Sequence, residues 1–248
     1  MRERLDTIPI YLINLERSEK RRATMQNRLD ALGFQHHWFR ARDGRADWEK
    51  LADTVDIPAF ERNTGRKVMK AEIGTFHSHL GVWQAFLETG QDVALVLEDD
   101  VVFHDNFVDA VNAALAQKDR WDFLKLNKIR AQYPTQRGEI GSYTLNAYVG
   151  SATGLGAYLI TRALAERLLP RMLPITRPID HELDRIFVHR FRHYGLEPFP
   201  SHVDDGNEST ITGTGFSEVR KFPKWKRLPN YLLRLRNLVG KWWYLRRH

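Results

Sequence analysis

The chain has 248 residues and a formal net charge of +7. Its length suits one compact domain. With 42% hydrophobic and 28% charged residues, it can bury a core and is not disordered overall. It has no cysteine, which excludes a disulfide scaffold, a thiolate-bound zinc ion and a thiol nucleophile. No apolar run approaches the roughly 20 residues of a membrane-spanning helix, and the N-terminal Met-Arg-Glu-Arg shows no signal-like apolar core, so we expect a cytoplasmic protein.

The first 90 residues alternate strand-like and helix-like patterns. Continuous apolar runs are typical of strands buried in a parallel sheet, and apolar residues at helical spacing are typical of helices. These patterns predict a strand at 8–15, a helix at 18–32, a strand at 37–41, an irregular stretch at 44–66 and a helix at 75–88. Ser18 is the expected N-cap of the first helix, and glycines follow both helices at 33 and 90.

The same alternation continues to residue 195. The clearest strand, at 93–97, runs directly into Glu98, Asp99 and Asp100. The later predicted elements are a helix capped by Asp105, strands at 122–126, 143–149 and 155–160, a helix capped by Thr161, and a helix from Pro178 to Gly195. Strands that alternate with helices predict an α/β layered fold with a mostly parallel central sheet. Ligands of such sheets bind beyond the carboxyl ends of strands, which directs attention to residues 98–100.

The positive charge is concentrated at the C-terminal end. Residues 219–248 contain ten Lys and Arg and no acidic residue, which leaves 28 basic against 31 acidic residues in 1–218. Basic residues mixed with Trp and Leu are typical of a segment that lies on an anionic membrane. We therefore predict a domain over 1–218 and a basic, amphipathic, membrane-associating tail over 219–248. The alternatives are a helix that packs its Leu face on the body and, less favoured, RNA binding; no nucleic-acid partner is expected.

The acidic triplet at 98–100 is the first candidate site. Repulsion and desolvation raise the pKa values of adjacent carboxylates, and a divalent cation relieves both effects. Oxygen ligands without cysteine fit Mg²⁺ or Mn²⁺. Because side chains alternate along a strand, Glu98 and Asp100 are expected to face one site and Asp99 the other side. The alternative is a solvated turn in which Asp99 or Asp100 caps the next element.

Five short motifs occur in order over residues 8–215. They are Ile13-Asn14-Leu15-Glu16-Arg17-Ser18 with Arg21 and Arg22, Glu72-Ile73-Gly74 with Ser78-His79, Leu95 through Val101, Pro178-Ile179-Asp180-His181, and Ser209-Thr210-Ile211. Together they resemble glycosyltransferase family 25, the lipopolysaccharide and lipooligosaccharide galactosyltransferase-like family related to the procollagen galactosyltransferases. Thr75 stands where that family often has Cys, at a position expected to pack rather than react. The resemblance implies a Rossmann-like GT-A fold, inverting transfer, and usually UDP-galactose with Mn²⁺.

Neutralising the leaving diphosphate with a bound metal is the first task that the resemblance implies. Asp100 is the expected ligand of Mn²⁺ or Mg²⁺, and Glu98 or Asp99 completes the shell or holds the ribose. His202 lies after the last predicted strand, where some GT-A enzymes place a final metal ligand; an exposed loop histidine is the alternative.

Holding the nucleotide sugar is the second task. Asn14 and Arg17 lie just past the first predicted strand and Asp43 just past the second, where uracil or phosphate would be met. The alternatives are a loop-capping Asn, an exposed Arg at a helix start and a turn Asp. A further set is expected to line the same pocket: Lys70, Ser78 and His79. A histidine at the edge of the core is the alternative for the last of these.

Deprotonation of the acceptor hydroxyl is the third task, and a carboxylate is the usual base. Asp180 is the expected base because the positive end of its helix favours an ionised side chain; helix N-capping is the alternative. Asp184 lies one turn further on and is expected to join a surface ion pair. The glycines at 150, 154 and 156 would let the backbone approach the donor sugar, or form a plain turn.

The expected function is inverting transfer of a sugar, with galactose from UDP-galactose implied by the resemblance, to a lipopolysaccharide, lipooligosaccharide or related glycan or glycolipid acceptor. The expected location is the inner face of the cytoplasmic membrane, reached through 219–248. One alternative is a metal-dependent phosphoryl-transfer hydrolase, which would need a second group of metal ligands. The other is a non-catalytic membrane or RNA adaptor that acts through the basic tail.

Overall fold

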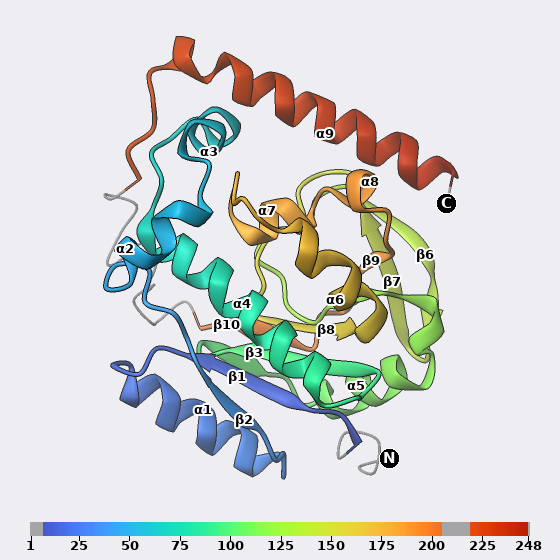
Figure 1. Ribbon diagram of the computed structural model, residues 1–248. Helices are drawn as coiled ribbons and strands as arrows, with labels where there is room; N and C mark the ends of the chain where they lie inside the picture. The colour runs from blue at the N-terminus through green and yellow to red at the C-terminus, as the bar shows by residue number, and fades with distance from the viewer. Residues whose placement is uncertain (1–6, 205–218, 248) are drawn as a thin grey trace.

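An eight-stranded sheet forms the centre of the protein, as seen in the computed structural model, which describes residues 7–204 and 219–247 (Figure 1). Its strand order is β2-β1-β3-β8-β5-β9-β7-β6. The strands are β1 (Ile10–Asn14), β2 (His37–Arg40), β3 (Val93–Glu98), β5 (Phe123–Lys125), β6 (Pro134–Ile140), β7 (Tyr143–Tyr148), β8 (Ala157–Thr161) and β9 (His193–Glu197). A separate two-stranded sheet joins β4 (Val101–Phe103) to β10 (Ser201–Val203).

The sheet is mixed. β1 runs parallel to both β2 and β3, and β5 runs parallel to β9, as expected for an α/β layered fold. β8 lies antiparallel between β3 and β5, and β7 is antiparallel to both β6 and β9. The α/β class predicted from the sequence is confirmed, but the prediction of a mostly parallel sheet is not: three pairings are parallel and four are antiparallel, because β8 and β7 each run against both of their neighbours.

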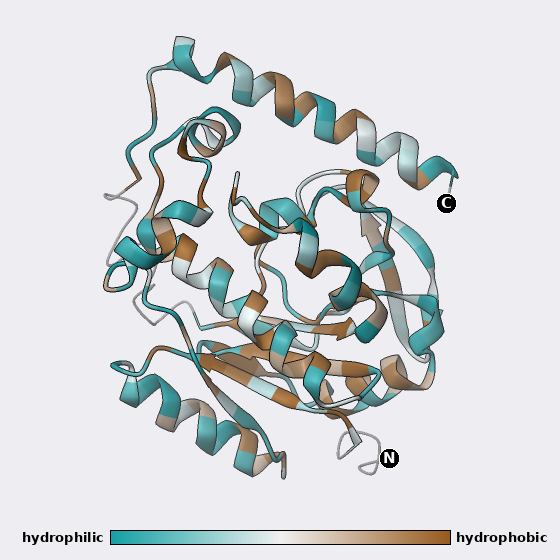
Figure 2. Cartoon of the chain, viewed as in Figure 1, coloured by the Kyte–Doolittle hydropathy of each residue, from teal (hydrophilic) through white to brown (hydrophobic). Residues whose placement is uncertain are grey.

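Helices cover both faces of the sheet, and each face has its own hydrophobic core (Figure 1). The alternation of side chains along β1 separates the two cores: Tyr11 and Ile13 face one, and Ile10 and Leu12 face the other. On the first face lie α4 (Lys70–Glu88) and α6 (Arg162–Leu168), and on the second lie α1 (Glu19–Ala31) and α5 (Phe107–Ala116). Figure 2 shows the corresponding hydrophobic strands in brown at the centre.

Several predicted boundaries shift in the structure. α4 begins at Lys70, earlier than the predicted residue 75, and the N-cap of α5 is Asn106 instead of Asp105. Thr161 caps α6 as predicted, accepting a hydrogen bond from the Leu164 amide. The stretch predicted to be irregular, 44–66, holds α2 (Trp48–Leu51) and α3 (Ile57–Thr64). That prediction was wrong because short helices leave little periodicity; the carboxylate of Asp56 caps α3.

The single helix predicted from Pro178 to Gly195 is also wrong. The structure has α7 (Ile179–Leu183), α8 (Ile186–His189) and then β9, which begins at His193. α8 ends at Arg190, whose φ of 54° is left-handed, and pairing with β5 then draws the next residues into the sheet. The structure also adds β6, whose exposed, polar sequence shows no strand alternation; its pairing with β7 is interrupted by a bulge between Gln136 and Gly138.

The C-terminal segment forms one long helix, α9 (Leu228–Arg247), that packs on α3 and α8 (Figure 1). Lys241 and Leu245 are buried against the body, and Asn230 Nδ2 donates to the carbonyl oxygen of Asn63. One of the alternatives predicted for 219–248 was a helix packed on the body. The structure agrees with it for the side of α9 that carries Lys241 and Leu245. Within 7–204 and 219–247, no helix combines the length and apolar character needed to cross a bilayer. The motif at 209–211 lies outside the described residues.

Candidate active site

The candidate active site is a cavity at the carboxyl ends of β1 and β3. These strands are parallel neighbours, with Ile13 opposite Glu98, so both end at the same edge of the sheet. The cavity is lined by residues from the end of β1, from α1, from the segment after β2, from α4 and from the turn after β3: Asn14, Arg17, Arg21, Arg42, Asp43, Gly44, Thr75, Ser78, Glu98, Asp99 and Asp100. The structure thus brings together most of the residues predicted to hold a nucleotide sugar.

Asp99 and Asp100 share one arginine, Arg21. Its guanidinium pairs with Asp99 and lies 3.1 Å from Asp100 Oδ2, and Asn14 Nδ2 donates to Asp99 Oδ2 at 2.6 Å. Burial raises the pKa of Asp99, and burial together with the Glu98 carboxylate raises the pKa of Asp100 to about 7. Asp100 Oδ1 is buried with no hydrogen-bond partner among the described residues. Asp99 is thus buried while Glu98 and Asp100 stay partly exposed, and the negative charge of the turn is only partly compensated.

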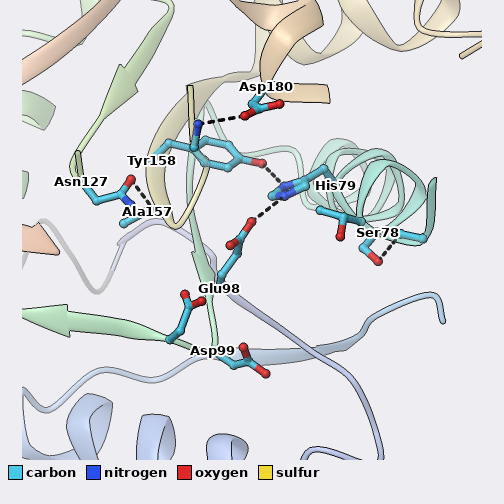
Figure 3. Close-up of polar contacts among 12 residues, drawn as sticks. Ser78, His79, Glu98, Asp99, Asn127, Ala157, Tyr158 and Asp180 are labelled. Carbon is cyan, nitrogen blue, oxygen red and sulfur yellow. Dashed lines mark hydrogen bonds and ion pairs between the residues drawn. The ribbon is translucent and has the colours of Figure 1, made fainter. Parts of the chain in front are cut away.

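Glu98 is oriented by a buried chain of hydrogen bonds on the other side of the turn (Figure 3). Its Oε1 atom lies 3.2 Å from His79 Nε2, and His79 Nδ1 lies 2.9 Å from the hydroxyl of Tyr158. That hydroxyl accepts from Trp83 Nε1 at 3.0 Å. A neutral His79 that accepts from Tyr158 and donates to Glu98 satisfies every member of the chain. His79 therefore positions Glu98 from beneath the site and does not itself line the cavity.

A close approach between two glycines fixes the segment after β2. A Cβ on Gly74 of α4 would overlap the backbone of Gly44, and one on Gly44 would overlap the carbonyl of Lys70. The Ser78 hydroxyl accepts from the Arg42 amide at 2.8 Å and donates to the Gly74 carbonyl at 2.7 Å. This packing gives a physical reason for the Glu-Ile-Gly and Ser-His motifs: they hold the strand-end loop against the helix.

Two other predicted nucleotide ligands meet, and one does not join them. Arg17 and Asp43 form an ion pair between the ends of β1 and β2. Lys70 is exposed, with its ammonium 5.2 Å from the ring centroid of Trp48. Its backbone carbonyl packs against Gly44 in the loop after β2. Its side chain does not line the cavity.

His202 is hydrogen-bonded to another histidine and does not line the first cavity. It lies on β10, paired to β4, and its Nδ1 atom is 2.8 Å from His104 Nε2. Over residues 7–204 and 219–247, no three Asp, Glu or His side chains form a group able to hold a metal. The described structure thus does not assemble Glu98, Asp100 and His202 as a three-residue centre. It also offers no second ligand group for the hydrolase alternative within those ranges.

Asp180 and Asp184 hold the loop at 150–154 through its backbone. Asp180 Oδ2 accepts from the Gly154 amide at 3.1 Å, the dashed line at Asp180 in Figure 3. Its Oδ1 accepts from the His181 amide at 2.8 Å. Asp184 Oδ1 accepts from the Ala152 amide at 3.1 Å and from Lys241 Nζ at 2.6 Å. Asp184 was predicted to form a surface ion pair; the pair is instead mostly buried, because α9 covers it.

Lys125 is a site residue that the sequence prediction missed. Its buried ammonium donates to the carbonyls of Thr153, at 2.9 Å, and Gly154. Burial lowers the pKa of Lys125 to about 8, while the nearby carboxylates of Asp180, Asp184 and Glu98 act in the opposite direction. A single lysine inside the apolar run of β5 was the available signal, since a buried ammonium requires partners.

Arg21 belongs to the first motif, and only the fold showed which carboxylates it pairs with.

A family model places this chain. The model described as glycosyltransferase family 25 (LPS biosynthesis protein) matches residues 7–183, and the chain belongs to this family. The resemblance inferred from the motifs is thereby confirmed. The matched range contains the ends of β1 and β3, the start of α4 and the first turn of α7.

Curated relatives agree with the family. A glycosyltransferase 25 family member of Anopheles gambiae is 32% identical over 257 aligned positions, which cover 92% of this chain and 43% of that protein. Procollagen galactosyltransferase 1 of Danio rerio is 25% identical over 85% of this chain and 39% of its own length. The probable inactive glycosyltransferase 25 family member 3 of Rattus norvegicus is 28% identical over 65% of this chain and 31% of its own length. The chain spans less than half the length of each of these relatives.

Replacing Gly74 by Ala tests how the loop after β2 is held. The added methyl meets backbone atoms of 42–44 that cannot rotate away, so we expect a loss of about 1–3 kcal/mol in the free energy of unfolding, measured in urea. Amide exchange at Arg42 should also accelerate. Thr75→Ala, at the next position of the helix, is the control and should change stability by less than about 0.5 kcal/mol. Unchanged stability and exchange in Gly74→Ala would contradict the close approach.

Proposed function

We propose that this chain is an inverting glycosyltransferase of the GT-A type that transfers a sugar, galactose in the first instance, from a UDP-sugar to a glycan acceptor of the lipopolysaccharide or lipooligosaccharide kind. The observation that carries the proposal is the partly compensated acidic turn at 98–100, beside the end of β1, in a chain of family 25. Galactose is supported by the name of the Danio rerio relative. Because the rat relative is named probable inactive, turnover itself is the first property to measure.

The acidic turn fits a divalent cation. Asp100 offers a buried oxygen without a partner among the described residues, and its raised pKa reflects burial and then repulsion by Glu98, both of which a cation would relieve. Mn²⁺ and Mg²⁺ take oxygen ligands and need only one or two carboxylates when substrate phosphates and waters complete the shell. Asp100, with Asp99 or Glu98, would hold the ion, and His202 is the weaker candidate because it is bonded to His104. The bound ion would supply Lewis-acid stabilisation of the departing diphosphate.

The remaining cavity residues would hold the donor. Asn14 Oδ1 is buried without a partner among the described residues, so it can accept from an N–H or hydroxyl of a nucleotide. Arg17 and Arg21 bring positive charge to the same cavity, where a diphosphate carries negative charge. His79 contributes from behind the cavity, where it orients Glu98, and Ser78 holds the Arg42 amide from the cavity wall.

Asp180 is the proposed base. Direct displacement with inversion needs a proton acceptor on the face opposite the leaving group. Each oxygen of Asp180 accepts one backbone amide, which fixes the carboxylate and leaves further lone pairs for a hydroxyl proton. The buried ammonium of Lys125 anchors the same loop through the carbonyl of Gly154, so the loop and the carboxylate are positioned together.

Asp100→Ala tests the leaving-group side of the proposal. UDP release from a panel of UDP-sugars, with Mn²⁺, Mg²⁺ or neither, should fall by at least about 100-fold in the variant, because the diphosphate loses its main compensating site. The half-saturating cation concentration for the unaltered protein should rise as the pH falls through about 7, since protons then compete for Asp100.

Asp30→Ala removes an exposed carboxylate of α1 away from the cavity; it is the matched control and should leave UDP release unchanged. If no UDP-sugar is bound or turned over with any of these cations, the enzyme proposal fails. An Asp100→Ala protein that keeps full activity would remove the acidic turn from the mechanism.

Asp180→Asn tests the base. The amide cannot take up the hydroxyl proton, so transfer to an acceptor should fall by about 10²- to 10⁴-fold while UDP binding, measured by calorimetry, is retained. Asp109→Asn alters a carboxylate in the first turn of α5, away from both strand ends, and serves as the control. Transfer at the original rate in Asp180→Asn would show that another group accepts the proton.

We infer in addition that α9 holds the protein on the anionic inner face of the cytoplasmic membrane. One stripe of the helix is buried against the body, and a second stripe of large apolar side chains is exposed; Figure 2 shows brown and teal alternating along it. The exposed large apolar side chains of α9 are Leu228, Tyr231, Leu232, Leu235, Leu238, Val239, Trp242 and Trp243. The ten basic residues of 219–248, with no acidic residue among them, match an anionic lipid surface.

Flotation with vesicles that contain anionic lipid tests this membrane contact. The full chain should float at low salt and less at high salt, because salt screens the basic residues. Leu232→Glu with Trp243→Glu should abolish flotation, whereas Ile57→Glu, at an exposed apolar position on α3, should not. Absence of flotation at low salt would reject the membrane, and self-association without lipid binding would assign the stripe to a second copy of the chain.

A further inference from the structure

A second cavity, of about 560 Å³, lies between α9 and the body. Its walls come from the end of α3, the start of α7, the segments at 130–133 and 149–151, and one face of α9. The volume falls within the range of about 300–1,000 Å³ that is typical of ligand pockets. Figure 1 shows α9 spanning this region from α3 to α8. None of the residues assigned above to the donor lines it.

The lining of this cavity is strongly basic. Five of its lining residues are Lys or Arg, and Asp184 is the acidic one. Three of the five cations are neutralised within the protein: Arg66 by Glu72 at 2.6 Å, Arg177 by Glu182 at 2.8 Å, and Lys241 by Asp184 at 2.6 Å.

The other two cations are Arg130 and Arg234. Neither guanidinium has a hydrogen bond or ion pair with any residue in the described parts of the chain. Both arginines are exposed and line the same cavity, to which they bring positive potential that no carboxylate of the described residues offsets. An Arg guanidinium presents paired N–H donors that match phosphate or carboxylate oxygens. The cavity is therefore suited to a ligand with a negative charge.

Polar side chains that suit sugar hydroxyls complete the lining. Asn63, Gln132, Ser151 and Asn237 offer amide and hydroxyl groups. Tyr133, also in the lining, is 70% exposed and presents a ring face on which a sugar can pack. Together with the two arginines, these groups describe a site for a charged saccharide.

Two segments that line the cavity adjoin the proposed base, one along the chain and one through the loop that Asp180 contacts. Pro178 and His181, which line the cavity, flank Asp180, and the lining segment at 149–151 leads into the loop whose Gly154 amide contacts Asp180. Lys241 fixes the α9 wall to this loop, because its ammonium donates to the Gly150 carbonyl and to Asp184. The α9 residues of this wall share one helix face by their spacing: Asn230, Arg234, Asn237 and Lys241.

We propose that this cavity is the acceptor site and that it binds an anionic saccharide, one that bears a phosphate or a carboxylate, through Arg130 and Arg234. The assignment of the bound sugar as an acceptor rests on the proposed function. The C-terminal helix then serves the reaction directly, as one wall of the acceptor site, in addition to any contact with lipid.

Binding measured without any donor tests the proposal independently of turnover. Glucose 6-phosphate and glucuronate are titrated into the full chain by saturation-transfer NMR and calorimetry, with glucose as the neutral comparison. Both anionic sugars, or one of them, should bind at least about tenfold more tightly than glucose, and the affinity should fall with added salt. The two arms distinguish phosphate from carboxylate recognition.

Arg130→Ala with Arg234→Ala should weaken the anionic sugar by at least about tenfold and leave glucose binding unaltered. Arg246→Ala removes the same charge from the same helix outside the cavity and should have no effect. Because neither arginine has a partner in the described structure, the thermal midpoint of the double variant should match that of the unaltered protein. Arg234→Lys, which keeps the charge without the paired donors, should lie between the two.

Equal binding of glucose and its anionic analogues, or full anionic-sugar affinity in the double variant, would overturn the proposal. Inorganic phosphate that displaces glucose 6-phosphate at equal concentration would overturn the assignment to a saccharide. UDP binding distinguishes failure of this inference from failure of the proposed function. A protein that binds UDP but shows no preference for anionic sugars refutes only the acceptor-site inference. A protein that binds anionic sugars but no UDP-sugar refutes the transferase.

Discussion

The burial of adjacent negative charges at the end of β3 is the constraint on which the site depends. Asp99 is buried and Asp100 is partly buried, and a single arginine from α1 and the side-chain amide of Asn14 at the end of β1 compensate them in part. Glu98, the third carboxylate, is directed to a buried histidine on α4. These contacts tie together the end of β1, the first turns of α1 and the middle of α4, so the cavity and its charge are set by the same few interactions. The remaining repulsion is what a bound cation would relieve in the proposed mechanism.

The loop at 150–154, part of which lines the second cavity, is held by charged groups. Its carbonyls at Gly150, Thr153 and Gly154 accept from two lysines, and its amides at Ala152 and Gly154 donate to two aspartates. Each of these backbone dipoles is thus matched to a charge of the appropriate sign. A loop held in this way needs no helix or strand of its own to keep a fixed shape, and it can place a carboxylate next to a substrate without long-range motion.

The C-terminal helix has two different sides, and its composition alone suggested only one. The apolar and basic residues of 219–248 indicated a membrane-associating tail. Lys241 is nevertheless buried, and its ammonium donates to Asp184 and to the Gly150 carbonyl of the loop. One side therefore completes the folded body and the basic cavity, while the other leaves apolar side chains exposed. Membrane contact and substrate binding would then be combined in one element, which would place a lipid-linked acceptor near the site that receives it.

The sequence alone determined the features that depend on neighbours in the chain. It located β1, β3, the Thr161 cap and the α/β class, and it placed Asn14, Arg17, Asp43 and the acidic triplet at one edge, because parallel strands end together. It did not find β6, the break between α7 and α8, or the partners of Lys125 and Lys241. Those depend on residues far apart in the chain, such as Asp184 and Lys241, where only packing decides whether a charge lies in water or against a carboxylate. Tertiary structure therefore decided which of the predicted polar residues line a cavity and which merely hold others in place.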